Sequence, residues 1–398
     1  MKLKSLILGS AAALLAVSGA RAADAVMAPE PEPVDYVRVC DAYGAGFFYI
    51  PGTETCMSIN GYVWFQVAGS TARDGGDTPG YYAGDQQGWY TGTRVRMNFD
   101  TRSETELGTL RGWIRLQADF DGSKVGDGGV GIDQAFIQLG GLVVGYGESA
   151  WFYQFNNSTL NYGSFTWGGL YYGYQERSRI SYEFGSKQGL YGVISLENPA
   201  DEYSYMPDIV GRVGYGGAWG AVALTGAYDH DRTDSYIIDP ITGEAEEFGA
   251  RPVGGDAGWS VKGEALINIP SMPGSAFKIV GYYNGSDSNY GPGSPLQGLV
   301  YSRGGTSYLL GQPEWSAMAS FLYQATPDLG LIVSGQYFGD AYEAGTDDTV
   351  SGTSAWAAEL EAVWTPVKNF EVRPTVAYTK AEHLDGTVSG FLRFTRYF

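Results

Sequence analysis

Arginine side chains stand at alternate positions in several segments of this chain, and guanidinium groups placed in this way act through their charge. Arg94 and Arg96 alternate with the apolar Val95 and Met97. The arginines with this placement are Arg94, Arg96, Arg111, Arg115, Arg177, Arg179, Arg373 and Arg393. Because a β-strand directs alternate side chains to opposite faces, these arginines lie on the polar faces of their strands. Facing water, they would set a field that acts on nearby ions.

Two roles are open to these arginines. Carboxylates such as Glu361 share the polar face, so cross-strand salt bridges that stiffen the structure are one role, although each contributes little where it is solvated. Arg94, Arg96, Arg111 and Arg115 lie on neighbouring predicted strands, and neighbouring like charges do not neutralise each other. We therefore expect these four to act mainly as a field-setting cluster.

Cys40 and Cys56 are the two cysteines of the chain. In an exported protein, a pair at this spacing is most simply a disulfide. It would close a hairpin in an N-terminal periplasmic segment at 23–60. Two free thiols or a metal site are the alternatives, but the segment lacks the further Cys or His ligands that a metal requires.

Signatures of catalysis are nearly absent from the sequence. The chain has two histidines, His230 and His383, and neither belongs to a recognisable nucleophile–base arrangement. There is no G-x-S-x-G, H-E-x-x-H or phosphate-loop motif. We expect no enzymatic activity, no cofactor and no bound metal.

Sixteen predicted strands position these side chains. They are 61–70, 92–100, 108–120, 131–139, 141–147, 177–185, 188–197, 208–216, 219–229, 259–269, 276–285, 314–324, 329–338, 355–365, 370–380 and 388–398. Each has one apolar and one polar face. In strand 355–365, Trp356 and Trp364 stand at the two ends of the apolar face, as two membrane interfaces would select. The pattern predicts an all-β fold, a 16-stranded antiparallel transmembrane β-barrel with a polar interior.

Long and short connections alternate between the predicted strands. Outer-membrane barrels have short periplasmic turns and long extracellular loops, so the alternation predicts that both termini are periplasmic. The third long connection, 148–176, includes Glu148, Trp151, Phe152, Tyr153 and Trp167. We expect it to fold inward and constrict the pore. Its aromatic rings would pack against the wall, or alternatively offer a stacking surface to sugars.

The first 22 residues have the features of an export signal. Lys2 and Lys4 precede an apolar run, and Ala20-Arg21-Ala22 fits a cleavage site. Removing 1–22 takes away three basic residues and no acid, which changes the net charge from −19 to −22. This acidic balance argues against nucleic acid as a partner, because phosphates bind basic surfaces.

Several motifs resemble those of a known family. VRVCDAYGAGFFYIPGTETC at 37–56, followed by GYV at 61–63, is similar to the N-terminal signature of alphaproteobacterial porins of the Brucella and Rhizobium type. SETELGTL at 103–110, IQLGG at 137–141 and LRFTRYF at 392–398 resemble further family landmarks. The resemblance implies a sixteen-stranded, trimeric general porin whose third outer loop folds into the pore. Phe398 resembles the aromatic ending that barrel-assembly machinery recognises.

These features together predict an outer-membrane porin, a water-filled channel for passive diffusion of small hydrophilic solutes and ions. Residues 61–398 would form the barrel as a homotrimer in contact with the lipid bilayer and lipopolysaccharide. A channel that prefers sugars or anions is one alternative. A structural or adhesive barrel with a plugged pore is another.

Overall fold

The computed structural model describes residues 38–73, 76–82, 87–121, 129–152, 163–186, 188–199, 206–230, 236–238, 245–247, 257–286, 288–303, 306–343 and 349–398. Cys40–Phe398 forms one compact unit. The predicted signal peptide at 1–22 lies outside the described residues, as does Tyr153.

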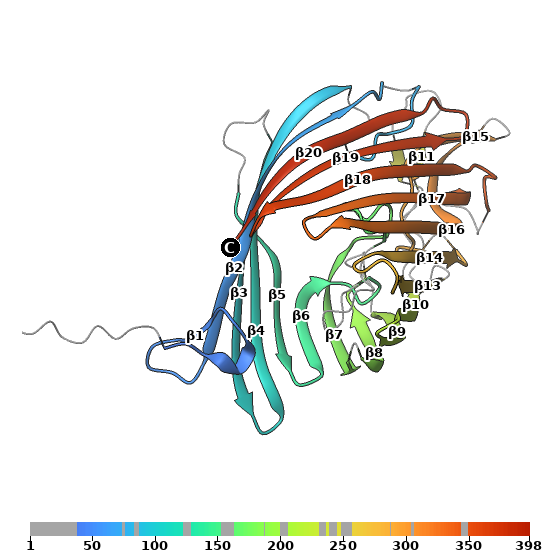
Figure 1. Ribbon diagram of the computed structural model, residues 1–398. Helices are drawn as coiled ribbons and strands as arrows, with labels where there is room; N and C mark the ends of the chain where they lie inside the picture. The colour runs from blue at the N-terminus through green and yellow to red at the C-terminus, as the bar shows by residue number, and fades with distance from the viewer. Residues whose placement is uncertain are drawn as a thin grey trace, which may run out of the picture. The chain divides into compact units, whose positions relative to one another are not determined.

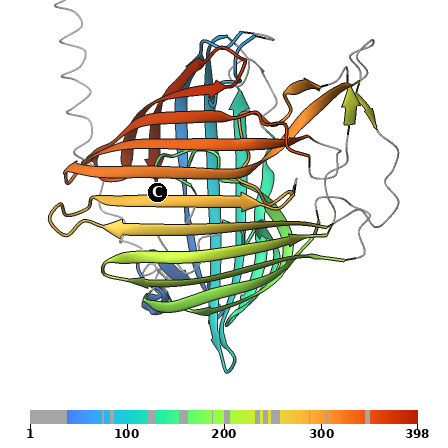
Figure 2. The same cartoon turned by 90° about the vertical axis from the view of Figure 1, so that its right-hand side faces the viewer.

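Within the described residues, sixteen strands form a closed ring (Figures 1 and 2). They are β2 (Cys56–Ser70), β3 (Gly88–Thr105), β4 (Gly108–Asp121), β5 (Gly131–Leu139), β6 (Leu142–Glu148), β7 (Glu176–Gly185), β8 (Gly189–Glu197), β9 (Asp208–Gly217), β10 (Gly220–Asp229), β13 (Gly258–Asn268), β14 (Ala276–Asn284), β16 (Thr306–Thr326), β17 (Leu329–Glu343), β18 (Ala355–Val367), β19 (Phe370–Ala381) and β20 (Thr387–Tyr397). Each pairs antiparallel with its neighbours along the chain. The predicted 16-stranded barrel is confirmed, and every predicted strand overlaps one of these.

The ring closes where the last strand meets the first. β20 pairs with β2 from Tyr62↔Tyr397 to Ser70↔Ser389. Beyond this ladder, the backbone N–H groups of Gly61 and Phe398 each donate to the other's carbonyl oxygen at 3.1 Å. A Cβ atom at Gly61 would lie 2.1 Å from the carbonyl oxygen of Arg96. Glycine at position 61 therefore allows β2, β3 and the chain end to meet.

The two faces of the barrel strands differ as the alternation predicts. On β18, Trp356, Leu360 and Trp364 are exposed, whereas Glu359 and Glu361 are buried. Closing the sheet pairs the backbone groups of all its strands, which a strand in lipid requires. Among the described residues, no helix is long and apolar enough to cross a membrane.

Short and long connections lie at opposite ends of the strands, as predicted. The short ones include 140–141 between β5 and β6, and 368–369 between β18 and β19. Gly140 and Asn369 adopt left-handed φ values of 55° and 63°, which such tight turns require. We call the ends of the barrel the short-turn rim and the long-loop rim.

Smaller elements flank the ring. The 3-10 helix η1 (Asp41–Tyr43) and strand β1 (Phe47–Tyr49) precede β2, and Cys40 is disulfide-bonded to Cys56 with their Cα atoms 6.0 Å apart. The predicted disulfide is therefore confirmed. On the long-loop side, β11 (Tyr236–Ile238), β12 (Ala245–Glu247) and β15 (Val300–Arg303) pair with one another or with the start of β16. The sequence pattern did not predict these four short strands.

Candidate functional site

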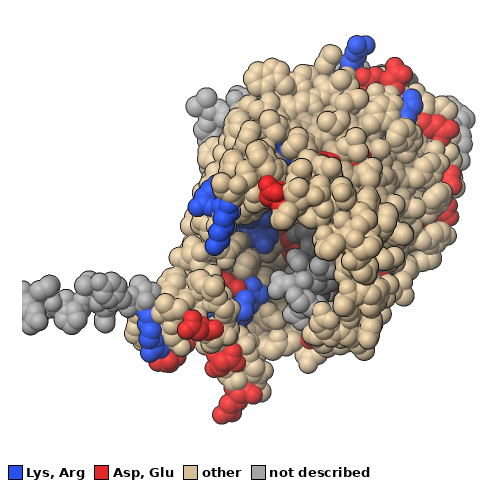
Figure 3. Space-filling view, in the orientation of Figure 1, with Lys and Arg blue, Asp and Glu red and all other residues tan. Residues whose placement is uncertain are grey.

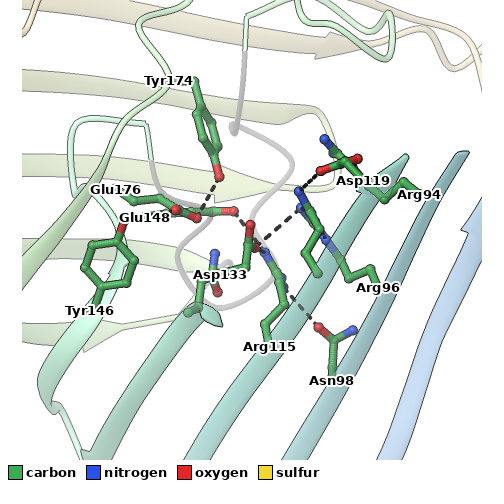
Figure 4. Close-up of polar contacts among 12 residues, drawn as sticks. Arg94, Arg96, Asn98, Arg115, Asp119, Asp133, Tyr146, Glu148, Tyr174 and Glu176 are labelled. Atoms are coloured by element: carbon green, nitrogen blue, oxygen red, sulfur yellow. Dashed lines mark hydrogen bonds and ion pairs between the residues drawn. The ribbon is translucent and has the colours of Figure 1, made fainter. Parts of the chain in front are cut away.

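Inward-facing arginines of β3 and β4 face carboxylates from neighbouring strands. Arg94 Nε lies 2.6 Å from Asp119 Oδ1 across the β3–β4 ladder. Arg96 Nη2 and Arg115 Nη1 each lie 3.4 Å from Asp133 Oδ2 of β5. The residues that point into this shared space in Figure 4 include Arg94, Arg96, Arg115, Asp133, Glu148 and Glu176. Arginines thus occupy the inner wall at β3 and β4, and carboxylates face them from β4, β5, β6 and β7.

Asp133 is a member of this group that sequence reasoning missed. The β4–β5 register shifts between Arg115, opposite Gln134, and Leu116, opposite Ile132. Asp133 is the extra residue of that bulge, so its side chain joins Gln134 on the inner face although the two are adjacent in sequence. Strict alternation would place the side chain of either Asp133 or Gln134 on the outer face of the barrel. The signal that could have revealed the bulge is a change of parity among the outward apolar residues, from Ile132 to Ile137.

A second group lies nearer the short-turn rim. Asp100 accepts hydrogen bonds from Arg111 at 2.9 and 3.0 Å and from Arg102 at 3.0 and 2.7 Å. Trp113 lies between two cations, with Arg111 Cζ 4.8 Å and Arg115 Cζ 5.6 Å from its ring centroid. Each of the four arginines expected to form a field-setting cluster therefore has a carboxylate within 3.4 Å. The arrangement is compatible with both roles left open above, because the arginines are paired across strands and their charges hold fixed positions on the inner wall.

The remaining predicted arginines are spread around the ring. Arg177 on β7 donates to Gln175 at 3.1 and 2.6 Å, and its neighbour Arg179 is 5% exposed and donates to Ser181. Across the barrel, Arg373 on β19 lies 2.7 Å from Glu361 and 2.9 Å from Glu371. Arg393 on β20 donates to the side-chain oxygen of Gln66, and it differs from these three in stacking on tryptophan rings.

The connection between β6 and β7 contacts the opposite side of the ring. Trp167 N donates to both carboxylate oxygens of Glu361 at 3.2 Å. Phe165 N donates to Ser320 Oγ at 3.1 Å, and Tyr171 exchanges hydrogen bonds with Gln336 at 3.1 and 2.7 Å. These partners lie on β16, β17 and β18, halfway around the ring from β6 and β7. The described part of this connection therefore crosses the inside of the barrel.

The start of the connection is held by further contacts. Glu148 closes β6 and lies 3.5 Å from Arg115. Ser149 Oγ donates to Glu197 at 2.6 Å, and Lys262 Nζ donates to the carbonyl oxygen of Trp151. The Trp151 and Phe152 side chains are buried, whereas the Trp167 side chain is 41% exposed.

Tyr81, from the first long connection, also contacts this segment. Its hydroxyl lies 2.7 Å from the carbonyl oxygen of Gly168 and 2.8 Å from that of Leu170. Burial raises the pKa of Tyr81 well above its ordinary value, and the nearby Glu359 carboxylate raises it further. The hydroxyl therefore stays protonated and able to donate well into the alkaline range.

Two cavities adjoin the crossing connection, inside the hollow where charged side chains are visible in Figure 3. The mixed cavity, about 600 Å³, is lined by both signs of charge, with Arg94, Arg96, Lys278, Asp133, Glu148 and Glu176. The arginine cavity, about 670 Å³, is lined by Arg94, Arg177 and Arg393 together with aromatic and amide side chains. Arg94, Trp167 and Tyr174 belong to both. A solute moving through the hollow would meet charge of both signs and aromatic surface within one short stretch.

Comparison with known proteins gives close relatives and distant structural neighbours. A family model described as a porin subfamily matches residues 24–390. Porin Omp2b of Brucella canis is 35% identical over 439 aligned positions that cover all of both chains. Porin Omp2b of Brucella neotomae is 44% identical over 258 positions, covering 58% of this chain and 66% of that one.

Solved structures of outer-membrane proteins are similar in fold. The outer membrane channel DcaP of Acinetobacter baumannii superposes with a TM-score of 0.58 at 11% identity, covering 88% of this chain and 99% of that one. An anion-selective porin from Comamonas acidovorans gives a TM-score of 0.54 at 11% identity, covering 87% of this chain and 100% of that one. At this level of identity the likeness concerns the barrel architecture alone.

Proposed function

The chain belongs to the porin subfamily and is an outer-membrane channel, as its N-terminal motif predicted, and from that premise we propose that the connection at 148–176 constricts its lumen. In this proposal the narrowest passage runs between that connection and the arginines of β3 and β4. Small hydrophilic solutes and ions would diffuse through it down their gradients.

The observation that carries this proposal is the attachment of the connection to the wall opposite its own ends. Three backbone N–H groups, those of Phe165, Trp167 and Tyr171, donate to side chains of β16, β18 and β17. A segment held in this way stays across the lumen while solutes pass. Cavities of about 670 and 600 Å³ adjoin it, so the constriction leaves space beside the connection.

The charges beside the connection support a transverse field. Arg94, Arg96 and Arg115 occupy one part of the wall, and Glu148 and Glu176 lie further around it (Figure 4). Opposed charges around a constriction orient dipolar solutes and tune ion passage. Because both signs are present, we expect weak rather than strong ion selectivity.

Assembly follows the family pattern in this proposal. The barrel would be a homotrimer with both termini periplasmic, bounded by bilayer lipid and lipopolysaccharide. Phe398 would be recognised by barrel-assembly machinery. Its ring is 50% exposed at the short-turn rim, where a partner could reach it.

Planar-bilayer recording tests the channel. We expect conductance steps grouped in threes, with a small reversal potential under a KCl gradient. A barrel that folds and inserts without conducting would refute the channel and favour a plugged structural barrel.

Cysteine modification tests the position of the constriction. Tyr174 is 48% exposed and lines both cavities, whereas Ser186 lies in an exposed short turn. A bulky thiol reagent should lower the conductance of Tyr174→Cys and leave that of Ser186→Cys unchanged. Equal responses would place the constriction elsewhere. The native pair does not interfere, because Cys40 and Cys56 are bonded to each other.

A further inference from the structure

The arginine cavity has an unusual charge composition. Three arginines line it, and its described lining residues include no aspartate or glutamate. Its other polar side chains are mainly amides and phenols, among them Gln66, Gln297 and Tyr171. The cavity can therefore attract a negative group without a carboxylate of its own to compete for it.

The three arginines differ in how their charge is balanced. Arg94 lies 2.6 Å from Asp119, and Arg177 directs two nitrogens at the Gln175 amide oxygen. Arg393 directs Nε and Nη2 at one amide oxygen, that of Gln66. Its Nη1 has no acceptor among the described residues, although the side chain is only 3% exposed. A buried guanidinium without a counter-ion is costly, and an anion at Nη1 would relieve that cost.

Aromatic rings hold the Arg393 guanidinium in one orientation. Its Cζ lies 3.5 Å from the ring centroid of Trp167, 4.4 Å from that of Trp64 and 4.5 Å from that of Phe391. Such stacking suits the flat guanidinium and would not hold an ammonium group in the same way. The unpartnered nitrogen is thus held in one orientation, buried just behind the wall of the cavity that Arg393 lines.

The ring of Trp167 supplies a second recognition surface. Its side chain remains 41% exposed although Arg393 lies against it. Tyr172 and Tyr174 line the same cavity. Aromatic surface of this kind favours the flat body of a solute.

We propose that Arg393 and Trp167 form a binding subsite for small carboxylate anions that carry a planar ring. In this proposal a small movement of the Trp167 ring uncovers Arg393 Nη1, the carboxylate accepts a hydrogen bond from it, and the ring of the solute lies against the exposed part of Trp167. This inference rests on the proposed channel, because the solute must reach the cavity through the lumen. An uncharged ring would leave the guanidinium unpaired, and a carboxylate without a ring would leave Trp167 uncovered.

Benzoate block of the KCl current tests the subsite. Benzoate should reduce single-channel current saturably, acetate should require at least about tenfold higher concentration, and benzyl alcohol should have no effect at matched concentration. Arg393→Gln should raise the half-blocking concentration about tenfold or more, since a charge-assisted hydrogen bond is lost. Arg396→Gln is the matched control, because Arg396 lies on the same strand with its side chain exposed and outside the cavity.

The outcomes separate the subsite from the channel itself. The subsite is refuted, and the channel stands, if the wild-type protein conducts KCl but benzoate does not block its current. The same conclusion follows if benzoate blocks the wild type and Arg393→Gln at equal concentrations. If there is no KCl current, the channel proposal itself fails. Should Arg393→Gln not assemble, Trp167→Leu replaces it, and it must weaken block by benzoate more than block by acetate for the subsite to hold.

Discussion

Glu361 connects the crossing segment to the barrel wall at the level of single residues. Its carboxylate accepts hydrogen bonds from Trp167 N at 3.2 Å, Arg373 Nη1 at 2.7 Å and Thr375 Oγ1 at 2.7 Å. The Glu361 carboxylate therefore both pairs with a charged residue of the barrel wall and holds the crossing connection in place. A neutral replacement would weaken both contacts at once.

Glu361→Gln should loosen the crossing segment. The amide can accept at one oxygen only, so hydrogen bonds to a charged acceptor, worth about 1.5–3 kcal/mol each, are weakened. We expect larger fluctuations of the open-channel current and a higher mean conductance than in the wild type. Glu371→Gln is the control, since Glu371 also pairs with Arg373, at 2.9 Å, and lies on the neighbouring strand. Equal current noise in the two variants would argue against a loop anchor at Glu361.

The hydrogen bond of Tyr81 should make the crossing connection sensitive to alkaline pH. Its pKa is raised in the folded protein, first by burial and then by Glu359, so its stabilising hydrogen bond is fully present below the ordinary tyrosine pKa of about 10. The contribution is lost as pH rises from there through the raised folded-state pKa. Wild-type conductance should therefore stay constant from pH 8 to about 10 and become noisier above that.

Matched variants separate Tyr81 from other tyrosines. Tyr81→Phe should be noisier already at pH 8, because the hydroxyl that lies 2.7 Å from Gly168 is missing. Tyr215→Phe, on the exposed outer face, should keep the wild-type pH profile. An alkaline transition that persists unchanged in Tyr81→Phe would assign it to another group.

At the scale of elements, Gly61 controls how closely β2, β3 and the chain end approach. A methyl group there would meet the Arg96 carbonyl oxygen at 2.1 Å and the Phe398 ring at 3.1 Å. Gly61→Ala should therefore destabilise the barrel by about 1–3 kcal/mol, the usual cost of overpacking. Gly263→Ala should change stability by less than about 0.5 kcal/mol, because no described atom beyond its chain neighbours lies within 4 Å of where the added methyl group would stand. Urea unfolding in detergent micelles compares the two, and equal midpoints would contradict a special role for Gly61.

The strands were predictable because the bilayer imposes a pattern on them. Apolar residues at every second position mark the outer face of segments such as β7, where Ile180, Tyr182 and Phe184 are exposed. Where a strand extends past the ring this constraint ends. β16 begins at Thr306, whereas the predicted strand begins at 314, and the register shifts between Leu310 and Pro313 in the added stretch. Proline and the loss of alternation concealed that extension.

The site was less predictable than the strands. The arginines themselves were identifiable from their parity, but their partners depend on register and on bulges, as the position of Asp133 shows. The stacking of Trp167 on Arg393 joins residues far apart in sequence. It depends on the path of the connection across the barrel, and no local pattern encodes that path.

At the scale of the whole molecule, charge acts at two ranges. The chain carries 44 acidic and 25 basic residues, and this surplus acts on ions through solvent. The wall pairs act within a few ångström, as in Arg94–Asp119 at 2.6 Å. Salt screens the long-range effect of the acidic surplus more strongly than it screens the wall pairs. The reason is that the Debye length falls from about 10 Å at 0.1 M to about 3 Å at 1 M.

Ion selectivity should accordingly depend on ionic strength. We expect a modest preference for K⁺ over Cl⁻ near 0.1 M that decreases towards none near 1 M, measured as reversal potential at a fixed salt ratio. A preference independent of salt would instead assign selectivity to the short-range wall pairs. Anion preference at low salt would show that the inner arginines outweigh the acidic surplus.

The seam between β2 and β20 also determines when the barrel can be completed during folding. Every other barrel strand pairs with neighbours along the chain, but here Gln66 meets Arg393, 327 residues later. Contacts of such separation form slowly. Until they form, β2 and β20 are open edges with unpaired backbone groups, and edges of that kind recruit strands from other molecules. A chain that stops short of its last strand would therefore be an aggregating sheet, however well its earlier hairpins had formed.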